Sequence, residues 1–272
     1  MTDPITKKMA FIEIFREYLK SDAFVFYQYL HQNRLAISLV QDNFKELNNS
    51  MTFLKTQTSD SRLWDFNNPS FHWRTQRKLI RLIANYLSSV FNLVNYTRKS
   101  IEPYIKLNGA INEAYENLKH AQFSSNSQHR FIQDLRNFTT HDSHLKIASE
   151  YSTNIAWDEP KRNIFVKKEE LLQSTEWSVQ SKQFIDTLGE KIYISDIINE
   201  HYSKFIKFQK EIYSMTLLVD ETRTKFFIQS VTTLLEQSKE YESSGILTFN
   251  LAYIRYLNYL LKAALRTTGV LR

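Results

Sequence analysis

Residues 71–100 read FHWRTQRKLI RLIANYLSSV FNLVNYTRKS. Apolar side chains recur here every three or four residues, which is the period of an amphipathic helix: Leu79, Ile83, Tyr86, Leu87, Val90 and Val94. We therefore expect a long helix over 71–100 that packs this apolar stripe into a core. Ser70 is a suitable N-cap residue, and Pro103 is expected to end the helix.

The same period appears on both sides of this stretch. Further helices are predicted over 5–19, 23–54, 110–123, 128 onward, 178–188, 196–218, 221–241 and 247–265. Residues 146–153 and 162–167 instead look extended, and Asp158-Glu159-Pro160 supplies turn chemistry between them. The predicted fold class is therefore all-α, a helical bundle with one small inserted β-hairpin.

Composition restricts the class of protein further. The chain has 272 residues with 19 Phe and 15 Tyr but only 4 Gly and 4 Pro, which argues against disorder and against a turn-rich β fold. It has no cysteine, so disulfides, zinc fingers and thiol nucleophiles are excluded, and a reducing intracellular setting is the simplest interpretation. The formal net charge of +6 is compatible with a nucleic-acid partner.

Neither a targeting segment nor a membrane span is expected. Residues 1–8 are polar, and Glu13 interrupts the apolar run over 9–15, unlike the core of a signal peptide. The longest apolar stretches carry charges every few residues. The sequence therefore predicts a cytoplasmic protein without a membrane partner.

Residues 136–141 read RNFTTH and combine two side chains suited to phosphate chemistry. Arg136 offers a fixed planar cation for a phosphate, and His141 has a side chain whose ordinary pKa suits proton transfer. On a regular helix these two side chains point about 140° apart. The helix must therefore end or distort near residues 139–140, or the phosphate site must be shared by two protomers. Asn137, four residues before His141, shares its face and is expected to orient the imidazole.

The motif resembles the signature of HEPN ribonucleases, in which an arginine followed by a polar residue precedes a histidine by a few positions. The resemblance covers roughly residues 71–218 and is specific over 131–141. The element order is also similar: the motif helix, a strand hairpin, a helix and a long closing helix. The resemblance implies one HEPN-like helical domain over 1–272, with a core at 71–218 and helical extensions at 1–55 and 221–272.

The resemblance also implies an activity. HEPN proteins dimerise so that two motifs face each other, and active members cleave RNA without a metal, many of them in toxin–antitoxin or phage-defence systems. Arg136 and His141 would then be catalytic, with Asn137 assisting. The implied partners are RNA, a second copy of the chain, and an antitoxin or regulatory protein. No glycine-rich loop and no metal-ligand set appears in the sequence, so neither a cofactor nor a metal is expected.

Other residues have two interpretations each. A basic stripe at helical spacing either follows an RNA backbone or is the solvated face of a helix: Arg74, Arg77, Lys78 and Arg81. Asp142 and His144 either assist His141 or are simply solvated. Glu113 and Glu116 are candidates for an acidic residue that some HEPN proteins carry. His129 looks isolated in the sequence.

Two functions compete with the ribonuclease. One is a non-catalytic HEPN-like helical module that binds RNA, a nucleotide or a protein. The other is an unrelated helical interaction protein in which the motif is accidental. The pairing of Asn137 with His141 favours the enzyme, because a binding module does not need it.

Overall fold

The structure is a computed structural model that describes residues 12–13, 16–56, 69–107, 109–124, 127–139, 145–152, 161–219, 221–242, 259 and 262. The chain forms two compact units, and each is described by itself. Unit 2 comprises residues 36–99 and 113–209, and unit 1 comprises residues 1–35, 100–112 and 210–272.

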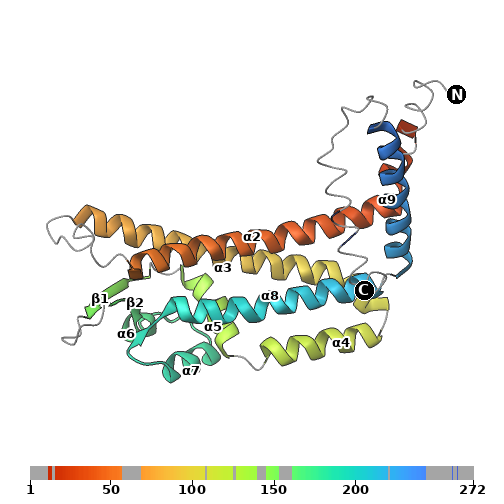
Figure 1. Cartoon of the computed structure of the whole chain (residues 1–272). Helices are drawn as coiled ribbons and strands as arrows, with labels where there is room; N and C mark the ends of the chain where they lie inside the picture. Colours follow the sequence, from red (N-terminus) through yellow and green to blue (C-terminus); the bar gives the residue numbers. More distant parts are fainter. Residues whose placement is uncertain are drawn as a thin grey trace. The chain divides into compact units, whose positions relative to one another are not determined.

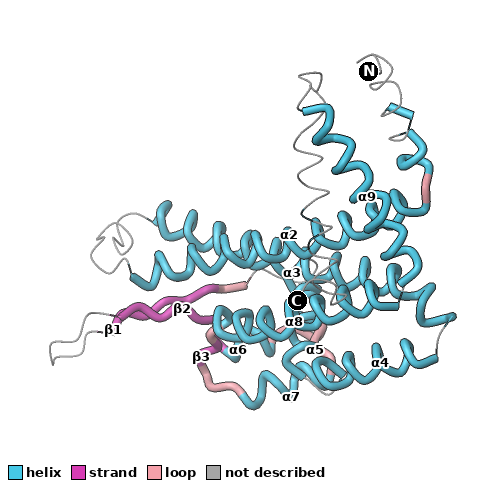
Figure 2. The backbone as a smooth tube through the Cα atoms, turned by 45° about the vertical axis from the view of Figure 1, so that its right-hand side comes forward, coloured by secondary structure: helices cyan, strands magenta, loops and turns pink. Residues whose placement is uncertain are grey.

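The described chain is mostly helical, as predicted (Figure 1 and Figure 2). Its α-helices are α2 (Asp22–Thr56), α3 (Pro69–Leu107), α4 (Gly109–Lys119), α5 (Ser127–Asn137), α6 (Lys168–Leu172), α7 (Val179–Thr187), α8 (Ile194–Val219) and α9 (Glu221–Glu242). A π-helical segment, η2 (His120–Ser124), lies between α4 and α5.

The predicted end of the helix at Pro103 is wrong. α3 continues through Pro103 to Leu107. Proline removes only the hydrogen bond to the carbonyl of Lys99, and the exposure of both residues lets water satisfy that carbonyl. Asn48 and Asn49 do not interrupt α2, because their neighbours Leu47 and Met51 are buried and hold the helix against its core.

The inserted hairpin is confirmed and gains a third strand. β1 (Ile147–Ser152) pairs antiparallel with β2 (Lys161–Lys167), and Ile147 faces Val166 in the register. β3 (Lys191–Ile192) adds to β2 on its other side. Two residues are too short a stretch to show a strand period, so β3 has no signal in the sequence.

Unit 2 is organised around α3, which contacts α2 and α8 through aromatic and polar side chains. The half-buried ring of Phe44 on α2 stacks on Tyr202 of α8 with ring centroids 3.6 Å apart, and lies 6.0 Å from the ring of Tyr86 on α3. Further along the same helices, the Thr97 hydroxyl donates to Oε1 of the buried Gln209 at 2.8 Å. These contacts hold α3 against α2 and α8, and α3 forms one side of the cavity described below.

Unit 1 has its own aromatic core. Phe26 of α2 packs edge-on against Phe227 of α9, with ring centroids 6.0 Å apart, and both rings are buried. The Thr224 hydroxyl donates to the carbonyl of Leu217 at 2.9 Å, which ties the start of α9 to the end of α8. The predicted helices over 5–19 and 247–265 lie mostly outside the described residues.

None of the described helices has both the length and the apolar character needed to cross a membrane.

The packing of α5 gives a test of this fold. Phe131 on α5 is fully buried, and its ring stacks on Trp177 with centroids 5.3 Å apart. Phe131→Ala should lower the free energy of unfolding by about 3–5 kcal/mol, because it leaves a cavity in the core. Urea denaturation followed by circular dichroism measures the change. Phe53→Ala, at a side chain that is 55% exposed, should cost far less, and equal effects would contradict the packing described.

Candidate functional site

The helix that carries the RNFTTH motif is held by a buried carboxylate as well as by aromatic packing. Asp134 of α5 accepts hydrogen bonds from the backbone N–H of Ser178 at 2.9 Å and from the Ser181 hydroxyl at 2.7 Å. Ser178 is the N-cap residue of α7, so the carboxylate lies at a helix N-terminus, where negative charge is favoured. Phe138 stacks on Trp177 with ring centroids 5.2 Å apart. α5 is therefore fixed at its middle and at its end.

α5 ends where the motif geometry requires. The α-helix stops at Asn137, and residues 138–139 are π-helical. The Thr139 hydroxyl donates to the carbonyl of Arg136 at 3.0 Å, which satisfies one of the last carbonyls of the helix. The predicted end or distortion of the helix before residue 141 is thus present among the described residues.

Arg136 lies over an aromatic ring. Its guanidinium carbon is 4.2 Å from the ring centroid of Phe91 on α3, a cation–π contact. Its Nη1 donates to Oδ1 of the adjacent Asn137 at 3.2 Å. Both partners restrict the side chain, so the guanidinium is oriented in the absence of any ligand.

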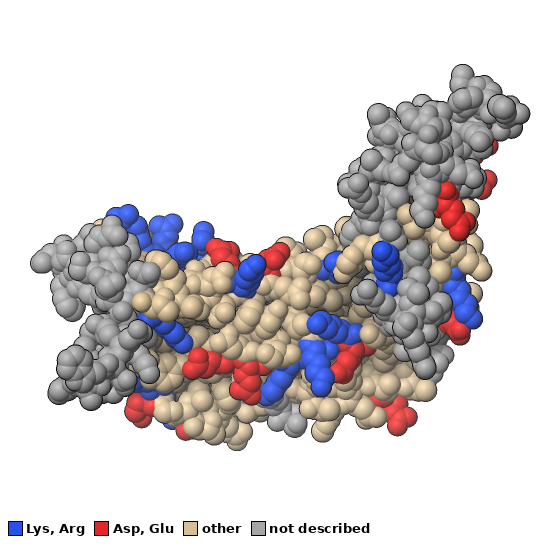
Figure 3. All heavy atoms as spheres, in the orientation of Figure 1, with Lys and Arg blue, Asp and Glu red and all other residues tan. Residues whose placement is uncertain are grey.

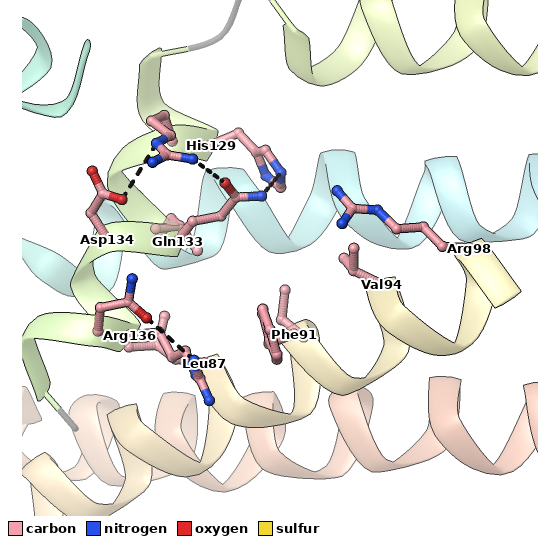
Figure 4. A pocket seen from close by; sticks show the side chains of 12 residues that line it. Leu87, Phe91, Val94, Arg98, His129, Gln133, Asp134 and Arg136 are labelled. Atoms are coloured by element: carbon pink, nitrogen blue, oxygen red, sulfur yellow. Dashed lines mark hydrogen bonds and ion pairs between the residues drawn. The ribbon is translucent and has the colours of Figure 1, made fainter. Parts of the chain in front are cut away.

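A cavity of about 240 Å³ opens beside Arg136, between α3 and α5 (Figure 4). Apolar side chains of α3 form one side, among them Leu87, Phe91 and Val94. Ile132 of α5 adds one more apolar side chain, and the other lining residues are polar or charged: Arg98, His129, Arg130, Gln133, Asp134, Arg136 and Asn137. Three arginines and one aspartate give this lining a net positive charge, which suits an anionic ligand.

The three arginines differ in how far their charge is compensated. Arg130 lies 3.4 Å from the Asp134 carboxylate and also hydrogen-bonds Ser178 and Gln133. Arg98 is exposed and forms no hydrogen bond or ion pair with any residue that the structure describes. Arg98 is therefore an available cation at the end of the cavity away from Arg136 (Figure 4).

A chain of hydrogen bonds leads from the cavity wall into the core of unit 2. Because Arg130 can only donate, its bond to Gln133 Oε1 fixes the amide so that Gln133 Nε2 donates to Nε2 of His129 at 3.0 Å. His129 must then carry its proton on Nδ1, which donates to Nε2 of His201 at 3.0 Å. By the same logic, His201 Nδ1 donates to the Tyr86 hydroxyl at 3.1 Å. One arginine therefore sets the tautomers of both histidines.

Burial and nearby cations keep this histidine pair neutral. Burial, with Arg98 and Arg130 close by, lowers the pKa of His129 to about 4. Burial, with His129 and Lys204 close by, lowers the pKa of His201 to about 3. Burial raises the pKa of Tyr86 above its ordinary value, so its phenol is also neutral. The expectation that His129 is isolated is wrong, because its partner is 72 residues away in the sequence.

The predicted site residues are placed as follows. Arg136 and Asn137 lie together at the end of α5, beside the cavity. His141, Asp142 and His144 lie outside the described residues. Glu113 and Glu116 are on α4 and do not line the cavity, and Glu116 pairs with Lys119 at 2.5 Å.

The predicted basic stripe lies nearer the start of α3 than the cavity does. All four side chains are exposed, and Lys and Arg side chains gather where α3 begins (Figure 3): Arg74, Arg77, Lys78 and Arg81. Arg74 and Lys78 border a groove of about 480 Å³ between α2 and α3. At 100° per residue, Arg74 and Lys78 point more than a quarter turn away from Phe91 and Val94, whereas Arg77 points about 40° and Arg81 about 80° away from Phe91. None of the four side chains lines the cavity beside Arg136.

Sequence reasoning missed two groups at the site. Arg98 is seven residues after Phe91 on α3, and His129 is seven residues before Arg136 on α5. In both pairs the helical period places the side chains on one face, so a helical projection would have grouped them. The contact between His129 and His201 has no such local signal.

Comparisons of this chain with family models, curated proteins and solved structures found no match. Among the described residues, no group of three or more His, Cys, Asp or Glu side chains is arranged to hold a metal ion.

The neutral histidine pair predicts how stability depends on pH. Its pKa values in the folded chain, about 4 and about 3, are below the roughly 6.5 of an unfolded histidine. Between pH 6.5 and 4 the unfolded chain therefore binds protons that the folded chain does not. The free energy of unfolding should fall as pH falls, with each histidine contributing up to about 1.4 kcal/mol per pH unit.

Urea denaturation at a series of pH values between 7 and 4 measures this dependence. Replacing both histidines, as His129→Gln with His201→Gln, should make the slope shallower. His120→Gln, at an exposed histidine of η2, should keep the slope of the unchanged protein. The same slope in all three proteins would show that the buried pair does not control it.

Proposed function

We propose that this protein is a metal-independent endoribonuclease of the HEPN type. The observation that carries the proposal is the placement of Arg136. It stands at the end of α5, oriented by Phe91 and Asn137, beside a cavity with a net positive lining. A pre-oriented guanidinium next to a cavity is suited to bind a phosphate and to stabilise the charge of a transition state.

The end of α5 adds support from backbone geometry. π-helical bonds join residues five apart, whereas α-helical bonds join residues four apart. Arg136 and His141 are five apart in the sequence, and the backbone becomes π-helical directly after Asn137. A turn of this kind reduces the angular separation that a regular α-helix would impose on the two side chains. We expect both to reach one phosphate, from one chain or across two.

The chemistry follows from these residues. His141 takes the proton of a ribose 2′-hydroxyl, and the 2′-oxygen attacks the phosphorus bound at Arg136. The bond from phosphorus to the 5′-oxygen breaks, and the imidazolium of the second protomer's His141 protonates that oxygen. The products are a 2′,3′-cyclic phosphate and a 5′-hydroxyl. DNA is not a substrate, because it lacks the 2′-hydroxyl.

The wider role is part of the same proposal. A homodimer would bring two motifs together and supply the acid and the base from different chains. We propose that RNA is the substrate, that an antitoxin or regulatory protein controls the activity, and that the protein acts in the cytoplasm as a toxin or anti-phage effector.

A non-catalytic binding module is the second candidate. The availability of Arg98 favours it, since a guanidinium beside a cavity with one apolar side serves a bound nucleotide equally well without any reaction. The two candidates differ in whether Arg136 and His141 are needed for cleavage or only for binding.

Cleavage of a mixed RNA pool in EDTA distinguishes them. Arg136→Ala should lower the cleavage rate by about 100-fold or more, because a transition-state contact is lost. His141→Ala should lower it by about 100- to 10,000-fold, the usual contribution of a general acid or base. Analysis of the ends should show cyclic phosphates and 5′-hydroxyls.

Arg223→Ala and His120→Ala, at exposed residues that do not line the cavity, are the matched controls and should cleave at the unchanged rate. Equal cleavage by all five proteins, or none that survives EDTA, would refute the endoribonuclease. Sedimentation of the unchanged protein checks the dimer, and a monomer at assay concentration would refute the composite site.

A further inference from the structure

The cavity beside Arg136 has two unlike walls. Phe91 and Val94 of α3 form an apolar wall, and the Phe91 side chain is 38% exposed. Across from them, Gln133 and His129 of α5 present polar groups (Figure 4). An apolar aromatic surface facing an amide is suited to a flat ring that carries hydrogen-bonding edges.

The polar wall is electrically neutral and leaves an amide available. The pKa of His129, about 4, keeps it uncharged at neutral pH, and Asp134 compensates Arg130. Gln133 uses one N–H for His129 and one lone pair for Arg130, so its amide retains a second N–H and a second lone pair. Such a group can pair with the edge of a nucleobase, which presents donors and acceptors side by side.

The size and the ends of the cavity restrict the ligand further. About 240 Å³ is below the roughly 300–1,000 Å³ of pockets that enclose whole drug-sized ligands, so a single ring system fits better than a complete nucleotide. Arg98 follows Phe91 by seven residues, about 10 Å along α3. Arg136 lies over the Phe91 ring. The guanidinium groups of Arg136 and Arg98 therefore lie at different ends of the cavity (Figure 4).

We propose that this cavity is a subsite for one nucleobase of the RNA, and that Arg98 binds a phosphate neighbouring the one on Arg136. The subsite rests on the proposed function, because it assigns the phosphate on Arg136 to the scissile position. The base lies between the Phe91 and Val94 side chains and the Gln133 amide. Arg98 and Gln133 are then residues that position the substrate without taking part in the chemistry.

Binding of an uncleavable strand tests the subsite. The probe is a fluorescein-labelled single-stranded oligonucleotide of 2′-O-methyl RNA, compared with an abasic strand of the same length, and fluorescence anisotropy gives both dissociation constants. Val94→Trp fills the cavity, and Asn92→Trp is its control, because Asn92 is an exposed residue of the same helix that does not line the cavity. Phe91→Leu is a second variant with little change in volume, and circular dichroism verifies folding.

The unchanged protein should bind the complete strand more tightly than the abasic one. Val94→Trp should weaken binding of the complete strand by roughly 5- to 100-fold, the usual effect of losing one stacked base, and leave the abasic strand unaffected. Phe91→Leu should weaken binding of the complete strand more than that of the abasic strand, because Phe91 also orients Arg136 and so affects the phosphate contact of both strands. Asn92→Trp should keep the preference. Equal binding of both strands by the unchanged protein, or a preference that survives in both folded cavity variants, would overturn the subsite.

The salt dependence of binding tests Arg98 separately. Arg98→Gln should reduce the slope of log K against log salt by about 0.7, the contribution of one phosphate contact on a single strand. Lys99→Gln removes the same charge at the next residue, which does not line the cavity, and should not change the slope. An unchanged slope in Arg98→Gln would overturn its role.

These measurements are independent of cleavage. A base preference that depends on Val94, in a protein that cleaves no RNA, would support the subsite and refute the ribonuclease. Cleavage that depends on Arg136 and His141, without any base preference, would support the ribonuclease and overturn the subsite.

Discussion

The buried carboxylate of Asp134 is the contact on which the site depends. A carboxylate removed from water is costly unless polar partners replace its hydration, and here Ser178 and Ser181 donate hydrogen bonds to it while Arg130 forms an ion pair with it. The same contact joins the middle of α5 to the first turn of α7. Because Asp134 is two residues before Arg136, the rotation of α5 that satisfies the carboxylate also turns Arg136 toward α3. The contacts of Asp134 therefore hold α5 in the fold and also set the direction of Arg136.

The helical part of this fold is predictable from the sequence because its period is local. The apolar stripe from Leu79 to Val94 indicates both α3 and the side that it buries. The rule that proline ends a helix is wrong at Pro103, where the backbone is exposed and α3 continues. β3 is not predicted, because its two residues are too few to show a period. In each case packing or solvent exposure decides the outcome, and neither is visible in a short stretch of sequence.

The candidate site was predictable only in part. Arg136 and Asn137 were found because the motif is contiguous, and the structure places them beside a cavity. The aromatic partner of Arg136 and the partner of His129 come from α3 and α8, which are distant in the sequence. For the predicted basic stripe, helical spacing groups the four residues correctly on one helix. It cannot say which neighbouring helix they face, and the structure places two of them beside α2.

The hydrogen-bonded chain from Arg130 to Tyr86 has a consequence for how the protein tolerates change. Arg130, Gln133, His129 and His201 each donate to the next member, ending at the Tyr86 hydroxyl, so each proton position depends on the one before it. A glutamate at position 133 would offer only acceptors, and both histidines would have to exchange tautomers for the chain to remain bonded. The effects of substitutions at these positions are therefore not additive. A substitution that reverses one hydrogen bond of the chain therefore has to be matched by changes at the other positions if the chain is to stay bonded.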